Sequence, residues 1–250
     1  MTESELSQTE PDFTDPAVVD PYRLPGGASP VRYDLTLLPD LAAATFTGTV
    51  VITVEVSETT NELCCNALDL EIDAAWVIVS DGTRVDTDSV ELDAEAERVT
   101  FRFEAPLPAG RVVLHVEFRG ELNDKLRGFY RSTFVDDAGD EQVIATTQFE
   151  ATDARRAFPC WDELEHKAVF VITLVVDHDL FAVSNAAELS RAPSTIHPGH
   201  DVVIFADTMK MSTYLVAFVV GPLEATDPVD VDGTPLRVVF PKGKGHLTGY

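Results

Sequence analysis

Residues 146–168 read TTQFEATDARRAFPCWDELEHKA, and this stretch decides how the rest of the chain is interpreted. It opens with the side-chain alternation of a β-strand, which ends at Glu150. A polar, turn-like segment follows, and then a Phe-Pro-Cys-Trp corner at residues 158–161. Glu150 therefore presents a carboxylate where a strand gives way to a turn, an arrangement that suits contact with a ligand.

Period-two alternation elsewhere in the chain predicts an all-β fold. In residues 31–37 apolar side chains alternate with polar ones, and Pro39 and Asp40 are expected to end that strand in a turn. Residues 48–56 are rich in β-branched side chains on both faces, with valine and isoleucine on the face expected to pack on the core. No long stretch has the spacing of an amphipathic helix.

Turn signals divide the remaining strands. Asp-Gly at 81–82 and again at 232–233 predicts tight hairpin turns that need positive φ. Strands at 99–103 and 112–118 are expected to form another hairpin around the proline- and glycine-containing segment 106–110.

Two segments are apolar on both faces. Residues 168–176 and 212–220 are therefore expected to form central strands that are covered on each side. We find no internal repeat that would suggest a different architecture.

Length and charge limit the organisation and the partners. The chain has 250 residues, 45% of them hydrophobic, and 43 acidic against 18 basic residues give a formal charge of −25. Such a charge repels phosphates, so nucleic acid and anionic membranes are not expected partners. Residues 1–21 are expected to be a flexible acidic tail, 22–238 a single β domain, and 239–250 the start of a connection to a further domain.

The sequence favours a cytoplasmic location. The N-terminal residues lack the cationic and apolar regions of a secretory signal. The longest apolar runs, at 169–176 and 214–221, are far shorter than the roughly 20 residues that span a bilayer. Cys64, Cys65 and Cys160 form an odd set without the spacing of a disulfide framework or a zinc ribbon, which suits a reducing compartment.

Other chemically capable residues have structural interpretations. Arg155 and Arg156 either grip a substrate carboxylate or, as we expect from the acids around them, form local ion pairs that fix the turn. Cys160 is expected to be a packed core thiol, not a nucleophile. His197 and His200 have a spacing that a metal can use, but the Pro-Gly between them favours a solvated loop. No catalytic residue and no metal ligand is therefore assigned to this chain.

Several motifs together resemble one family. With residues 146–168, the segments YRLP at 22–25, GELNDKLRGFYRS at 120–132 and MSTYLVAF at 211–218 occur in the order seen in zinc aminopeptidases of the aminopeptidase N type. The resemblance covers about residues 22–225. It implies the saddle-shaped, many-stranded, antiparallel N-terminal β domain of that family.

The resemblance also implies roles for two residues in the Gln-Phe-Glu element. Glu150 is expected to bind the free α-ammonium group of a peptide, since a fixed carboxylate gives a charge-assisted contact that an internal peptide bond cannot make. Gln148 is expected to use its amide at the edge of the pocket for the first substrate side chain, while Phe149 points into the core. The alternative is that Gln148 and Glu150 form the polar face of an ordinary strand.

In that family a helical His-Glu-x-x-His and a further Glu hold zinc, and the 250 residues contain no such motif. The chain is thus expected to be a substrate-binding N-terminal domain, inactive alone, that works with a catalytic domain in cis or in trans. One alternative is a non-catalytic interaction module derived from the same family. Another is a β-sandwich for adhesion or carbohydrate binding.

Overall fold

The computed structural model describes residues 23–249 and is all-β, as predicted. The expected tail at residues 1–21 lies outside the described residues. Within 23–249 no helix has the length and apolar character needed to cross a bilayer. The helical segments found there are short 3₁₀ turns: η1 (Ala154–Arg156), η2 (Thr213–Leu215) and η3 (Gly245–Leu247).

The largest sheet has eight strands in the order β13-β14-β11-β1-β2-β8-β4-β5. Neighbours run antiparallel except for β1 and β11, which are parallel. Its members are β1 (Ala28–Asp40), β2 (Thr45–Val56), β4 (Leu70–Ile78), β5 (Arg84–Asp86), β8 (Gly110–Glu121), β11 (Val169–Asp177), β13 (Glu188–Pro193) and β14 (His200–Phe205).

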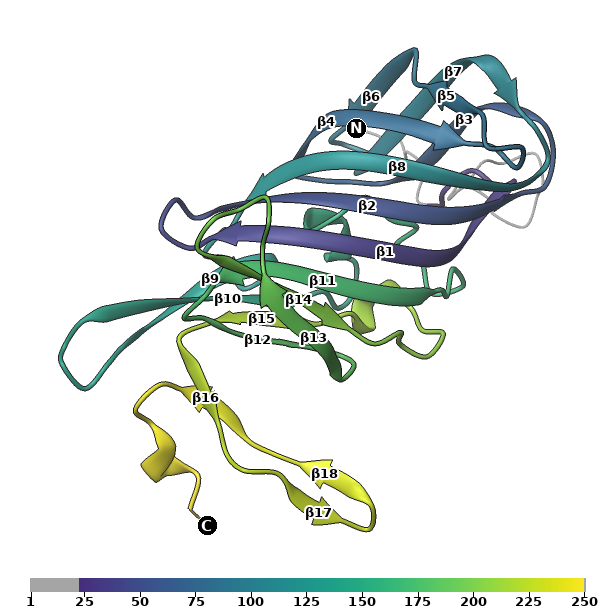
Figure 1. The fold of residues 1–250 in the computed structure, drawn as a ribbon. Helices are drawn as coiled ribbons and strands as arrows, with labels where there is room; N and C mark the ends of the chain where they lie inside the picture. Colours follow the sequence, from purple (N-terminus) through teal and green to yellow (C-terminus); the bar gives the residue numbers. More distant parts are fainter. Residues whose placement is uncertain (1–22, 250) are drawn as a thin grey trace, which may run out of the picture.

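Two smaller sheets lie near opposite ends of the large one (Figure 1). The three-stranded sheet β3-β7-β6 lies near β5, and the four-stranded sheet β12-β15-β10-β9 lies near β11. The first contains β3 (Thr60–Asn66), β6 (Ser89–Asp93) and β7 (Arg98–Leu107). The second contains β9 (Gly128–Val135), β10 (Glu141–Gln148), β12 (Phe181–Ser184) and β15 (Phe218–Gly221).

Two strand pairs follow β15 and project from the rest of the chain in Figure 1. They are β16 (Leu223–Ala225) with β19 (Val239–Pro241), and β17 (Val229–Val231) with β18 (Thr234–Leu236). Both predicted Asp-Gly turns are confirmed: Gly82 joins β4 to β5 with φ +86°, and Asp232 and Gly233 join β17 to β18 with φ +52° and +84°.

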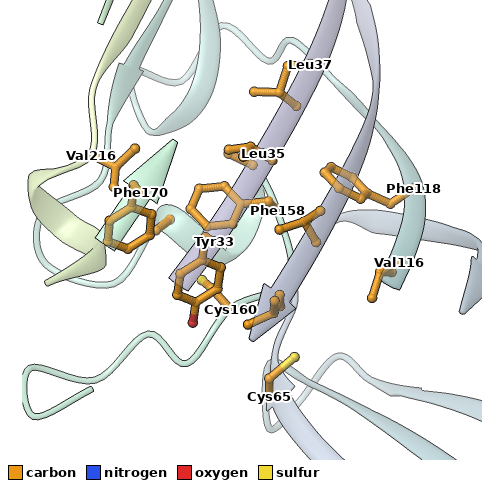
Figure 2. Close-up of a cluster of buried hydrophobic side chains, with 14 of the residues drawn as sticks. Tyr33, Leu35, Leu37, Cys65, Val116, Phe118, Phe158, Cys160, Phe170 and Val216 are labelled. Atoms are coloured by element: carbon orange, nitrogen blue, oxygen red, sulfur yellow. The ribbon is translucent and has the colours of Figure 1, made fainter. Parts of the chain in front are cut away.

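The predicted inward faces of β1 and β2 are buried. Side chains from the eight-, three- and four-stranded sheets form one contiguous hydrophobic cluster, part of which is drawn in Figure 2. Apolar area removed from water is the main stabilising contribution in such a core. The contributors from β1 and β2 are Tyr33, Leu35, Leu37, Phe46, Val50, Ile52, Val54 and Val56.

The two ends of β1 differ from prediction. Val31 is 36% exposed because the pairing with β2 shifts register between Pro30 and Arg32, and this bulge turns Val31 out of the alternation. The turn expected at Pro39 and Asp40 was placed too early, since β1 includes both residues. The parallel pairing with β11 ends at Leu37 and Leu174, before Pro39, so the missing proline N–H breaks no ladder with β11.

The predicted hairpin of residues 99–103 with 112–118 is wrong. β7 pairs with β3 and β6, whereas β8 pairs with β2 and β4. The segment 106–110 therefore carries the chain from one sheet to another. Alternation identifies each strand, but it does not say which strand is its neighbour.

The central strand predicted at residues 212–220 is also wrong, whereas the one at 168–176 is largely β11. η2 occupies residues 213–215, and β15 begins only at Phe218. Side-chain hydrogen bonds hold the turn: Ser212 Oγ donates to Leu164 O at 3.1 Å and Thr213 Oγ1 donates to Asp162 Oδ1 at 2.5 Å. Such bonds compete with strand pairing.

Gly48 tests the close packing of β1, β2 and β8. A Cβ at this position would lie 2.6 Å from Phe118 Cζ and 2.8 Å from Leu37 Cδ2. We predict that Gly48→Ala lowers the free energy of unfolding by about 1–3 kcal/mol, measured by chemical denaturation, because the core must shift. Gly26→Ala is the control, since a Cβ added at this position would meet no neighbouring atom within 4 Å. Equal stabilities of the two variants would contradict this packing.

Candidate functional site

Phe149 fixes the direction of its two polar neighbours. It is 2% exposed and packs edge-on against Phe158 and Phe218, with ring centroids 6.1 and 5.9 Å apart. The prediction that Phe149 points into the core is confirmed. Gln148 and Glu150, on either side of it, are both exposed.

Gln148 and Glu150 lie at the end of a well-paired strand. β10 pairs with β9 along its whole length, and the last pair joins Gln148 to Gly128. The Gln148 side-chain amide donates to the backbone carbonyl of Glu150 at 3.4 Å. The structure thus brings the two predicted site residues together, with Gln148 bracing the backbone at Glu150.

A tight turn follows Glu150. The Asp153 N–H donates to Phe149 O at 2.9 Å, and the Phe158 N–H donates to Ala154 O at 3.2 Å across η1. A cavity of about 380 Å³ begins beside this turn, and neither Gln148 nor Glu150 lines it. Its lining includes Ala151, Thr152, Leu164 and Tyr214.

The turn is anchored by a buried ion pair. Arg155 and Asp162 are 9% and 3% exposed. Arg155 Nε donates to Asp162 Oδ2 at 3.0 Å, and Arg155 Nη2 donates to Asp162 O at 3.2 Å. A third guanidinium nitrogen donates to Glu97 Oε2 at 2.9 Å. All three guanidinium nitrogens of Arg155 therefore have hydrogen-bond acceptors, as a buried charge requires.

Asp162 is held from other parts of the chain as well. Besides the hydrogen bond from Thr213 at the start of η2, its backbone N–H donates to Asn66 Oδ1 at 3.1 Å. Asn66, the last residue of β3, also forms an isolated β-bridge with Cys160. These contacts join the Glu150 turn to two distant segments of the chain.

Arg156 makes a second set of ion pairs. Its Nε donates to Asp153 Oδ1 at 2.7 Å, and its Nη1 contacts Asp69. The prediction of a local ion-pair network around this turn is confirmed. The sequence did not indicate the partners Asn66, Asp69, Glu97 and Thr213, because no motif spacing connects them to residues 146–168.

Removing the charge of Asp162 tests this anchor. We predict that Asp162→Asn lowers the free energy of unfolding by about 3–5 kcal/mol, because Arg155 would lose its buried counter-charge and keep only the part-exposed Glu97. Asp86→Asn is the control: Asp86 pairs with Arg84, but both side chains are more than half exposed, so its loss is expected to cost under about 1 kcal/mol. Denaturant titration measures both, and similar costs would show that the buried pair is not an anchor.

Cys160 is a packed thiol, as predicted. Cys65 and Cys160 are fully buried, and burial raises the pKa of both thiols well above the ordinary value. Figure 2 shows both within the core cluster. Cys64 is half-buried, and burial raises its pKa as well. None of the three is disulfide-bonded.

Thiol labelling tests these burial states. The thiolate is the reactive form, so a raised pKa slows labelling at neutral pH. We predict that a thiol reagent modifies Cys64 slowly and leaves Cys65 and Cys160 unmodified in the folded chain, whereas all three react in denaturant. Rapid labelling of Cys160 in the folded chain, located by mass spectrometry, would contradict a structural role.

One group of side chains has the composition of a metal site. Glu163, Glu165 and His166 have ligand atoms within 4.8 Å of one another. However, Glu163 accepts the Leu24 N–H at 2.5 Å, and Arg23 forms ion pairs with both glutamates. The Arg23 guanidinium already pairs with both carboxylates, and the group has one imidazole where the His-Glu-x-x-His zinc site has two. The group does not fit that site.

His197 lies in the connection between β13 and β14, as predicted, whereas His200 is the first residue of β14 and pairs with Asp177 of β11. Their ring centroids are 6.2 Å apart. The His197 N–H donates to Ser194 Oγ at 3.0 Å, and His200 Nε2 lies 3.3 Å from Asp177 Oδ1. The first contact stabilises the turn, and the second joins β14 to β11.

Comparison with known proteins is consistent with this geometry. The family model described as peptidase M1 N-terminal domain matches residues 29–215, which include Gln148, Glu150 and the buried anchor. Aminopeptidase M1-B of Oryza sativa subsp. japonica is 43% identical over 224 residues, which is 90% of this chain and 25% of that protein.

Other relatives show the same coverage. Aminopeptidase M1 of Arabidopsis thaliana is 43% identical over 225 residues, covering 89% of this chain and 25% of the relative. The puromycin-sensitive aminopeptidase of Caenorhabditis elegans is 40% identical over 234 residues, covering 94% and 25%. The chain thus spans about a quarter of the length of these relatives, and the matched part is their N-terminal region.

Proposed function

The chain belongs to the peptidase M1 N-terminal domain family, and from that premise we propose that it is the substrate-binding domain of a zinc metallo-aminopeptidase that removes N-terminal residues from peptides. The observation that carries this proposal is the placement of Glu150. Its exposed carboxylate follows a phenylalanine locked in the core and precedes a turn held by the Arg155–Asp162 pair. A fixed, solvent-facing carboxylate is what recognition of a peptide's ammonium group needs.

In this proposal Glu150 binds the free α-ammonium group of the substrate. An internal peptide bond has no such cation, so the contact selects chain ends over chain interiors. Gln148 braces the backbone of Glu150 and presents its amide beside Glu150 for the first substrate side chain. Both residues act by binding and orientation.

Membership of the M1 family implies zinc in the complete aminopeptidase, where a bound metal activates water for hydrolysis. We assign no zinc ligand to this chain, because the Glu163, Glu165 and His166 group does not fit that site. The proposed partners are therefore peptide N-termini and a catalytic domain, in cis or in trans. The unpaired cysteines support a proposed location in the reducing cytoplasm.

A chimera tests the role of Glu150. This chain replaces the equivalent region of aminopeptidase M1 of Arabidopsis thaliana, to which it is 43% identical. We predict that Glu150→Ala lowers kcat/KM on aminoacyl fluorogenic substrates roughly 10- to 150-fold, since a hydrogen bond to a charged group contributes about 1.5–3 kcal/mol.

The matched control is Glu141→Ala, which removes an exposed carboxylate from the other end of β10. It is expected to leave kcat/KM unchanged. The chain on its own is expected to show no hydrolysis with zinc added. Full activity of the Glu150→Ala chimera, or chelator-sensitive hydrolysis by the chain alone, would overturn the proposal.

A further inference from the structure

A second polar cleft lies beside the Glu150 turn. It has a volume of about 720 Å³ and is formed by parts of β2, β4 and β8 and by the loop that joins β8 to β9. Four of the chain's 18 basic residues line it, which is notable in a chain with a charge of −25. They are Arg119, Lys125, Arg127 and Arg156.

Two of these cations are already neutralised. Arg119 pairs with Glu71 at 2.6 Å and with Asp73 at 2.7 Å, and Arg156 pairs with Asp69 and Asp153. These ion pairs form one wall of the cleft, where four carboxylates surround two guanidinium groups.

Lys125 and Arg127 differ from that wall. Both side chains are exposed, and neither forms an ion pair with another residue between 23 and 249. Of the acids that line the cleft, Glu121 likewise has no ion pair within that range, and Asp124 lies in the same loop. Lys125 and Arg127 are therefore two exposed cations of this cleft whose charges no ion pair in the described part of the chain uses, with Glu121 and Asp124 nearby in the sequence.

The loop that carries these cations is held in place. Asn123 Oδ1 accepts the Lys125 N–H at 2.8 Å, and Asn123 Nδ2 donates to Arg127 O at 2.9 Å. The Arg131 N–H donates to Asn123 O at 2.8 Å, which ties the loop to β9. A ligand would meet a preformed backbone, so little ordering of the loop opposes binding.

The cleft and the candidate site share a boundary. Arg127 directly precedes Gly128, the residue that pairs with Gln148. A Cβ at Gly128 would lie only 2.8 Å from Arg156 Cβ, so the start of β9 packs directly on the turn that follows Glu150. The turn after Glu150 thus borders the cleft through Arg156, which lines it.

We propose that Lys125 and Arg127 bind a carboxylate group of a peptide in this cleft. Guanidinium matches a carboxylate in a two-bond fork, and lysine adds a mobile charge. The overall negative charge opposes polyanions, whereas a single carboxylate needs only the two cations that no ion pair within residues 23–249 uses. The carboxylate comes from a peptide C-terminus or an acidic side chain. The choice of a peptide as ligand rests on the proposed function, whereas the binding site itself does not use Glu150.

N-acetylated peptides test the cleft without the ammonium contact. Isothermal titration of the full chain uses N-acetyl-Ala-Ala-Ala as the free acid, the same peptide as its C-terminal amide, and N-acetyl-Ala-Glu-Ala amide. If the site binds a peptide C-terminus, the free acid is expected to bind at least about tenfold more tightly than N-acetyl-Ala-Ala-Ala amide at low salt; if it binds an acidic side chain, the Glu-containing peptide is expected to do so. The difference in affinity is expected to shrink as the salt concentration rises.

The double variant Lys125→Gln/Arg127→Gln is expected to abolish this difference. Lys210→Gln/Lys242→Gln removes two exposed charges elsewhere and is expected to retain it. Melting curves check that both double variants fold. If Lys125→Gln/Arg127→Gln does not fold, the two single variants replace it, and each is expected to lose part of the affinity difference. Equal affinity for all three peptides, or equal behaviour of the two double variants, would overturn the proposal.

Glu150→Gln separates this inference from the proposed function. It is expected to leave binding of the acetylated peptides unchanged, because they have no ammonium group. If the acetylated acids fail to bind while Glu150→Ala still lowers activity in the chimera, only the cleft assignment fails. If they bind but Glu150→Ala has no effect on activity, the cleft remains and the role of Glu150 fails.

Discussion

The buried pair of Arg155 and Asp162 is the constraint on which the candidate site depends. Arg155 is almost wholly enclosed, so its charge is tolerable only with the carboxylate, the backbone oxygen and Glu97 around it. Asp162 in turn accepts a hydrogen bond from Thr213 and donates its backbone N–H to Asn66. Because these partners come from distant parts of the chain, the turn after Glu150 takes its conformation only when the sheets have assembled around it.

Sequence patterns predicted what is local in this fold. Alternation identified β1 and β2, and the Asp-Gly pairs identified two turns, because side-chain direction and positive φ are set within a few residues. Strand neighbours are set by long-range packing, which is why the β7–β8 hairpin was predicted wrongly. Residues 212–220 were predicted as a strand from their apolar character alone, while Ser212 and Thr213 use side-chain hydrogen bonds that no hydrophobic pattern reveals.

The candidate site, too, was predicted from the sequence only in part. Gln148 and Glu150 were predicted from motif resemblance, and the strand period correctly placed Phe149 between them in the core. The anchor partners and the cleft at Lys125 and Arg127 were missed. The segment with Lys125 and Arg127 was interpreted only through its resemblance to a family. The two residues become candidates for ligand binding because the pairing of Gly128 with Gln148 brings that segment beside the site. Whether a charged side chain is available to bind a ligand depends on its neighbours in the folded chain, which the sequence does not give.

The central claim is that the buried pair acts through the position of Glu150. A double-mutant cycle in the chimera tests it most directly, with Arg155→Lys, which keeps the charge but loses the guanidinium fork, combined with Glu150→Ala. The account predicts that Arg155→Lys lowers kcat/KM when Glu150 is present and has no further effect when Glu150 is absent. Fully additive losses, with both variants folded, would contradict it.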